Sequence, residues 1–177
     1  MFSIRKNVIL KIILWITFFA YFLFLVKVVL IKHLPLELIV YQLHRIDFEL
    51  ISRSFANSNL IPFKTISDYI VNPVSAKITI GNVIGNIVVF IPVGLLAPFL
   101  VLKKYQPLAS LKISLFASFG ISLIFEVIQL LTYFWSFDVD DLLLNTFGGV
   151  LGFFIGFMFI NLYHDYMLKH YSKTIEH

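Results

Sequence analysis

The sequence predicts an all-α integral membrane protein with four transmembrane helices and an outer loop that contains a partly amphipathic helix. Of its 177 residues, 59% are hydrophobic and 14% are charged, whereas an ordinary soluble domain has roughly 45–50% apolar and about 25% charged residues. The mean hydropathy is +0.91, and four apolar stretches are long enough to cross a bilayer as helices. This composition excludes a typical soluble enzyme. The lack of cysteine excludes a disulfide scaffold, a thiolate metal site and a cysteine nucleophile.

We interpret the whole chain as one membrane domain. The first apolar stretch follows Arg5 and Lys6, as a secretory signal would, but it continues beyond Lys27 without a small-residue cleavage site, so we expect a retained anchor. The second stretch contains Pro92 and Gly94, which membrane helices tolerate when neighbouring groups satisfy the freed backbone. Within the domain of residues 1–177, the spans are expected at about 8–31, 78–102, 108–135 and 142–162, with an outer loop at 32–77 and a cytoplasmic tail at 163–177.

The positions of lysine and arginine predict the orientation, because cytoplasmic flanks of membrane helices carry an excess of these residues. The turn before the fourth span has three acids and no base, namely Asp138, Asp140 and Asp141. We therefore expect this turn outside and both termini in the cytoplasm. The net charge of +4 then reflects topology and an attraction to anionic membrane lipids, and no basic cluster indicates nucleic-acid binding. The sequence does not define an oligomeric state.

The outer loop carries an apolar repeat at helical spacing. The repeat predicts an amphipathic helix on the outer membrane surface, although 45–50 also alternates as a strand would. Its apolar residues are Leu36, Ile39, Val40, Leu43, Ile46 and Leu50. The segment 57–63 (NSNLIPF) ends any such helix.

Five carboxylate or carboxamide side chains are expected inside the membrane, where each must find a polar partner. Counting along each span at the rise of an α-helix places all five in the outer half of the bilayer. Asn82 and Asn86 are four residues apart, and Glu126 and Gln129 are three apart, so each pair lies on one helix face. We expect a polar pocket that opens outward beneath the three aspartates. The candidate ligand-binding residues are Asn82, Asn86, Glu126, Gln129, Asp138, Asp140, Asp141 and Asn145.

Each of these residues also has a structural interpretation. Intramembrane carboxamides commonly join helices by hydrogen bonds, and Asp140 and Asp141 would cap the fourth helix. For Glu126 a functional role is the default for an intramembrane carboxylate. The alternative for Asp138, Asp140 and Asp141, together with Asn145, is an oxygen-rich site for Mg²⁺ or Ca²⁺.

These landmarks together resemble the VanZ-like family of small bacterial membrane proteins. The resemblance covers about residues 59–156, and the family often has Gly-Arg shortly before the first aspartate, where this chain has 134–136 (FWS). The matching motifs are 59–66 (NLIPFKTI), 85–86 (GN) with 90–94 (FIPVG), 126–129 (EVIQ), 137–141 (FDVDD), 145–146 (NT) and 148–149 (GG).

The resemblance implies a multi-pass protein of the bacterial cell membrane, associated with lowered susceptibility to teicoplanin and related lipoglycopeptides. We expect a protein that is not an enzyme and whose pocket binds a lipid-linked cell-wall precursor or a lipidated ligand. The alternative is a membrane enzyme acting on a lipid-linked phosphate, with Glu126 as general acid or base and a divalent cation at the aspartate turn. A third class, a small transporter, depends on a helix break at Pro92 and Gly94.

Overall fold

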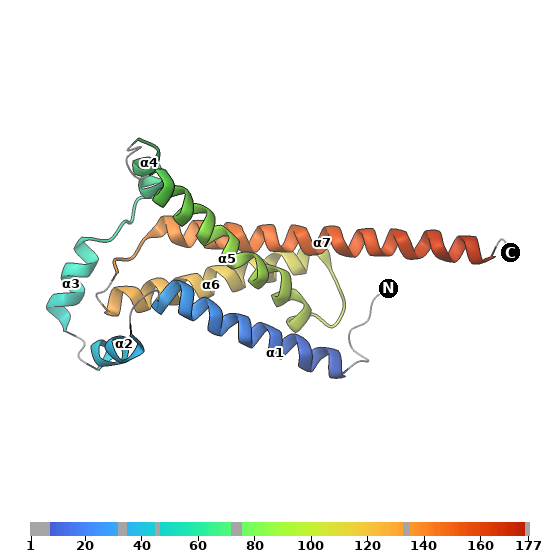
Figure 1. Cartoon of the computed structure of the whole chain (residues 1–177), viewed down its shortest axis with the longest axis horizontal. Coiled ribbons are helices and arrows are strands. Elements are labelled where there is room, and N and C mark those ends of the chain that lie inside the picture. Colours follow the sequence, from blue (N-terminus) through green and yellow to red (C-terminus); the bar gives the residue numbers. More distant parts are fainter. Residues whose placement is uncertain (1–7, 32–34, 45–46, 72–75, 133–134, 176–177) are drawn as a thin grey trace.

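Four long helices form the body of the molecule. The computed structural model describes residues 8–31, 35–44, 47–71, 76–132 and 135–175. In Figure 1 the first long helix begins, and the last one ends, at the same end of the molecule, which we call the terminal end. Three short helices lie at the opposite end, which we call the loop end.

Each long helix is apolar enough to cross a membrane. They comprise α1 (Val8–Leu25), continued directly by the π-helix η2 (Val26–Ile31), then α5 (Ala76–Val101), α6 (Pro107–Thr132) and α7 (Val139–Ile175). The part of the chain that the structure describes contains no strand. The predicted all-α protein with four membrane-spanning helices is therefore confirmed.

The helix limits differ from the expected spans in two places. The third helix ends at Thr132, so that Trp135 lies in the following turn. The fourth begins at Val139 and continues to Ile175 without a break, so most of the expected tail extends the helix.

The second span is one continuous helix, although Pro92 and Pro98 lie inside it. A proline removes the hydrogen bond to the carbonyl four residues earlier, which for Pro98 is the carbonyl of Gly94. The Ser114 hydroxyl of α6 donates to that oxygen at 2.6 Å. A neighbouring helix thus replaces the lost bond, and the break on which the transporter hypothesis depends is absent.

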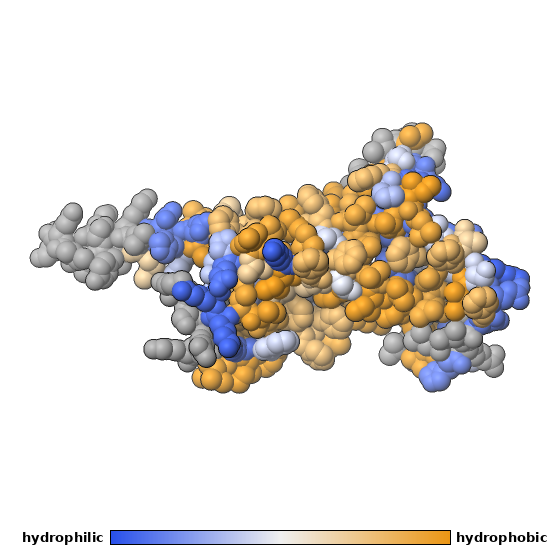
Figure 2. Space-filling model, turned by 180° about the vertical axis from the view of Figure 1, so that it is seen from behind, coloured by the Kyte–Doolittle hydropathy of each residue, from blue (hydrophilic) through white to orange (hydrophobic). Residues whose placement is uncertain are grey.

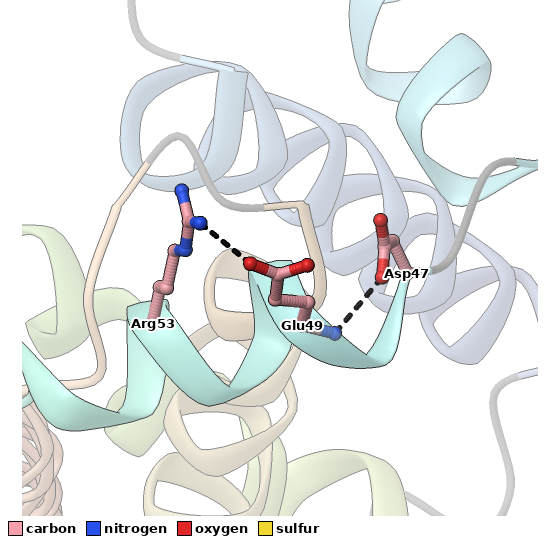
Figure 3. Close-up of polar contacts among 3 residues, drawn as sticks. All are labelled: Asp47, Glu49 and Arg53. Atoms are coloured by element: carbon pink, nitrogen blue, oxygen red, sulfur yellow. Dashed lines mark hydrogen bonds and ion pairs between the residues drawn. The ribbon is translucent and has the colours of Figure 1, made fainter.

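The loop end carries α2 (Leu36–Leu43), α3 (Phe48–Ala56) and α4 (Lys64–Val71). The amphipathic segment expected as one helix is therefore two. Helix α3 starts at its own N-cap, because the Asp47 carboxylate accepts the Glu49 N–H at 2.9 Å. Figure 3 shows this cap together with the exposed ion pair between Glu49 and Arg53.

The hydrophobic core lies where α1, η2, α5 and α6 meet. Leu25, Val29, Phe90, Val93 and Phe125 form one buried cluster. The Tyr21 hydroxyl, from α1, donates to the Val89 carbonyl of α5 at 2.7 Å. Packing and a hydrogen bond therefore join the first span to the others.

Glycine allows a close contact between α5 and α7. A Cβ atom on Gly94 would overlap the carbonyl oxygen of Gly149, and one on Gly149 would overlap the Ser118 hydroxyl of α6. Small residues at such crossings let membrane helices approach closely. The serines of α6 recur every fourth residue on the face that meets this contact, and all are buried: Ser110, Ser114, Ser118 and Ser122.

The outer surface of the bundle suits lipid. Large hydrophobic side chains on the spans remain exposed, including Trp15, Phe116 and Phe154. In Figure 2 hydrophobic residues cover most of the face shown, and hydrophilic residues gather toward its two ends. This distribution is the one expected of helices surrounded by acyl chains.

We predict that Gly94→Ala destabilises the bundle by about 1–3 kcal/mol, the usual cost of overpacking, because the added methyl group overlaps the backbone of α7. The thermal unfolding midpoint of the purified full chain in detergent measures this effect. Gly120→Ala is the matched control, since a Cβ atom there meets nothing within 4 Å. Equal midpoints for the two variants would contradict the packing described for α5 and α7.

Candidate functional site

The loop end is held together by the first turn of α7. The Asp140 side chain is fully buried, and its two oxygens accept the backbone N–H groups of Phe63 at 2.5 Å and Ile66 at 3.2 Å. The first N–H groups of a helix have no partner within that helix. A carboxylate from α7 thus caps α4, which begins at Lys64.

Asp138 makes a second connection to the same segment. Its Oδ1 accepts the Asn59 side-chain amide at 2.9 Å, and its Oδ2 accepts the Thr65 hydroxyl at 2.7 Å. The backbones of Asn59 and Asp138 also form an isolated parallel bridge, in which Asn59 N–H donates to Phe137 O at 2.9 Å and Val139 N–H donates to Asn59 O at 3.0 Å. Residues 59–66 therefore lie fixed against the start of α7.

Phe63 adopts a backbone conformation that side chains other than glycine rarely adopt, with φ at 66°. Such strain persists only where the surroundings hold it in place. Here the Phe63 N–H is bound by Asp140. The same geometry leaves Leu60, Ile61 and Phe63 exposed at the tip of the segment.

Glu126 of α6 stabilises the turn before α7 through a hydrogen bond. Its side chain is 1% exposed, and its Oε2 accepts the Asp138 N–H at 2.8 Å. An intramembrane carboxylate must find polar partners, and the turn supplies one.

A cavity of about 670 Å³ opens beside these contacts. Its walls combine polar and apolar groups, and η2, α4, α5, α6, the 135–138 turn and α7 all contribute. The lining residues include Lys27, Val29, Thr65, Asn82, Asn86, Gln129, Trp135, Asp138 and Asp141. We call this cavity the loop-end pocket.

Two hydrogen bonds hold amide side chains in the walls of the loop-end pocket. Asn86 of α5 donates to the Asp141 carboxylate at 2.5 Å, and Gln129 of α6 donates to the Val29 carbonyl at 3.1 Å. These bonds orient polar groups from different helices toward one space.

The structure brings together five of the eight candidate residues, because Asn82, Asn86, Gln129, Asp138 and Asp141 all line the loop-end pocket. The other three lie outside its walls. Glu126 binds the turn and Asp140 caps α4. Asn145 is buried deeper, where it donates to the Ser122 hydroxyl at 2.9 Å.

Two expectations about the aspartates are corrected. Among the described residues, no group of three or more His, Asp or Glu side chains is arranged to hold a metal ion, because Asp138 and Asp140 bind the 59–66 segment whereas Asp141 binds Asn86. The cap of α7 is Asp138, whose Oδ1 accepts the Asp140 N–H at 2.8 Å; the expected caps, Asp140 and Asp141, lie inside the first turn.

Lys27 is the main site residue that sequence analysis missed. In the sequence it is only a base within the first apolar stretch, yet it lines the loop-end pocket. Thr65 was also missed, although it lies in the 59–66 motif. Its role depends on Asp138, which is 73 residues away in the chain.

The fold and the arrangement of polar side chains define a multi-pass α-helical membrane protein with a polar pocket at one end of its bundle. The model of the VanZ/LLP1 family matches residues 9–160, nearly the whole chain. The chain therefore belongs to the VanZ-like family. Comparison with curated proteins and with solved structures gives no match.

We predict that Asp140→Ala loosens the 59–66 segment and lowers the unfolding midpoint, because it removes two hydrogen bonds to a charged group, each worth about 1.5–3 kcal/mol. The rate of tryptic cleavage after Lys64 and the thermal midpoint measure the effect. Asp68→Ala, an exposed acid on the same helix, is the control and should change neither. If both variants behave like the unmodified protein, Asp140 does not hold α4.

Proposed function

We propose that this protein is a non-enzymatic component of the bacterial cell membrane that binds the polar head of a lipid-linked cell-wall precursor or of a lipidated antibiotic. Binding in the loop-end pocket would change how the outer surface interacts with teicoplanin and related lipoglycopeptides. Membership of the VanZ-like family supports the antibiotic connection. The observation that carries the proposal is a pocket with both polar and apolar walls within the membrane-spanning bundle.

The proposed orientation has the loop end outside and both termini in the cytoplasm. It is supported by the lysines at the terminal end, where Lys103 and Lys104 lie exposed between α5 and α6, since such residues mark cytoplasmic flanks. The acidic turn before α7 then faces outward, and the pocket is accessible from the outer leaflet.

The pocket chemistry fits a ligand with a charged head and an apolar chain. Lys27, a base in the lining, suits a phosphate, and the amide residues Asn82 and Asn86 add polar character that suits a sugar or peptide. Val28, Val89 and Trp135 supply an apolar wall. Ligand sites commonly combine apolar surface with a few oriented polar groups in about 300–1,000 Å³.

The enzymatic alternative receives no support from this geometry. A general acid or base must come within hydrogen-bond reach of the substrate, but Glu126 is buried behind the turn and does not line the pocket. The aspartates that would hold a cation are bound to the protein itself.

We expect Lys27→Gln to reduce the effect of the protein on teicoplanin susceptibility, because the variant loses the positive charge of a residue that lines the pocket. The measurement compares the minimum inhibitory concentration in a deletion strain complemented with each variant, with vancomycin as the control antibiotic. Lys64→Gln is the matched variant, an exposed lysine at the same end that does not line the pocket. If deletion itself changes neither susceptibility nor surface binding of teicoplanin, the proposal is wrong for this protein.

Substitutions of Glu126 distinguish a structural role, in which its side chain binds the turn before α7, from a role in acid–base chemistry. Glu126→Gln keeps an oxygen that accepts the Asp138 N–H, so stability and cellular effect should remain near those of the unmodified protein. Glu126→Leu removes the acceptor of the part-buried Asp138 N–H, and the loss should be about 1–3 kcal/mol of stability. A folded Glu126→Gln protein that has lost all cellular effect would instead favour the enzymatic alternative.

A further inference from the structure

A second cavity, of about 540 Å³, lies at the terminal end of the bundle. Its walls come from α1, α5, α7 and the turn between α5 and α6, and they are almost entirely apolar; they include Leu14, Leu95, Phe99 and Gly156. The spans that form it are those long and apolar enough to cross a membrane. An apolar cavity between such spans matches the chemistry of a lipid acyl chain.

One polar atom in the wall of this cavity lacks a partner. The Tyr105 hydroxyl is buried and makes no hydrogen bond within the described parts of the chain, and its ring stacks on Phe99 with centroids 6.5 Å apart. Burial raises the pKa of Tyr105 above its usual value, so the phenol remains a donor at neutral pH. A buried hydroxyl without a partner is unfavourable, and the Tyr105 hydroxyl is therefore poised to donate to a ligand.

Positive charge flanks the same turn. Lys103 and Lys104 directly precede Tyr105 in the turn, and both are exposed. Among the described residues at the terminal end, the acidic residue is Asp165 on α7. It is exposed and lies 4.0 Å from His164. Basic residues beside a cavity between membrane helices favour an anionic lipid headgroup.

We propose that the terminal-end cavity binds one acyl chain of an anionic phospholipid. The lipid phosphate lies at Lys103 and Lys104, and a lipid ester carbonyl accepts the hydrogen bond of the Tyr105 hydroxyl. Gly156 lines the cavity without a side chain, and a Cβ atom there would crowd the end of Leu95, another wall residue, at 3.1 Å. This site is separate from the loop-end pocket and does not depend on the function proposed for it.

The test is a titration of the full chain in detergent with phosphatidylglycerol, or with phosphatidylcholine of the same acyl composition, read by native mass spectrometry. The unmodified protein should bind one phosphatidylglycerol molecule about tenfold or more tightly than phosphatidylcholine, given roughly fivefold per lysine. The double variant Lys103→Gln/Lys104→Gln should lose this preference and keep the weaker binding. Lys112→Gln, farther along α6, should retain the preference.

Two further variants test the cavity itself. Gly156→Leu fills it and should weaken both lipids by about tenfold or more, whereas Gly120→Leu, at a position with open space around the added Cβ atom, should bind as the unmodified protein does. Tyr105→Phe removes the hydroxyl alone and should weaken both lipids by about two- to tenfold.

Unchanged affinity in Gly156→Leu, or an equal loss in Gly120→Leu, would overturn the proposal. If Gly156→Leu fails to fold, Tyr105→Phe decides the question, because full affinity in that variant places the lipid elsewhere. An unchanged lipid preference in Lys103→Gln/Lys104→Gln would exclude the assignment of the headgroup.

Discussion

The arrangement of the loop end depends on two carboxylates at the start of α7, of which that of Asp140 is fully buried. Asp138 and Asp140 together accept bonds from Asn59, Phe63, Thr65 and Ile66. The helices α2–α4 are too short to be stable alone, so these bonds and the bridge at Asn59 supply the fixed point of the long connection between the first two spans. The same residues place one wall of the loop-end pocket.

The close approach of α5 and α7 supplies the other constraint. Because Gly94 and Gly149 bring the two backbones into contact, Asn86 lies within hydrogen-bond distance of Asp141 about two turns nearer the loop end. The Ser114 hydroxyl satisfies the carbonyl that Pro98 leaves free, so α5 continues as one helix to the terminal end. Packing in the middle of the membrane thus determines where polar groups meet at its edge.

The sequence predicted features that depend on local composition. Hydropathy and length were sufficient for four spans, and the depth of Asn86 and Gln129 along their helices was sufficient to place them in one pocket. Contacts between distant segments were not predictable in this way. Asp140 was expected to cap its own helix, but it caps α4, 74–77 residues earlier in the chain. Lys27 could not be assigned to a pocket from the sequence, because most of the other lining residues come from segments distant in the chain, between Thr65 and Asp141. The i, i+4 recurrence of Ser110, Ser114, Ser118 and Ser122 was visible in the sequence and would have identified the packed face of α6.

Hydrogen exchange of the unmodified protein in lipid nanodiscs tests most directly the claim that the acidic turn holds the outer segment. If Asp138 and Asp140 fix residues 59–66, the amides of Asn59, Phe63 and Ile66 should exchange as slowly as that of Val139, which bonds to Asn59. Rapid exchange at Asn59, Phe63 and Ile66, with α7 remaining protected, would contradict the account.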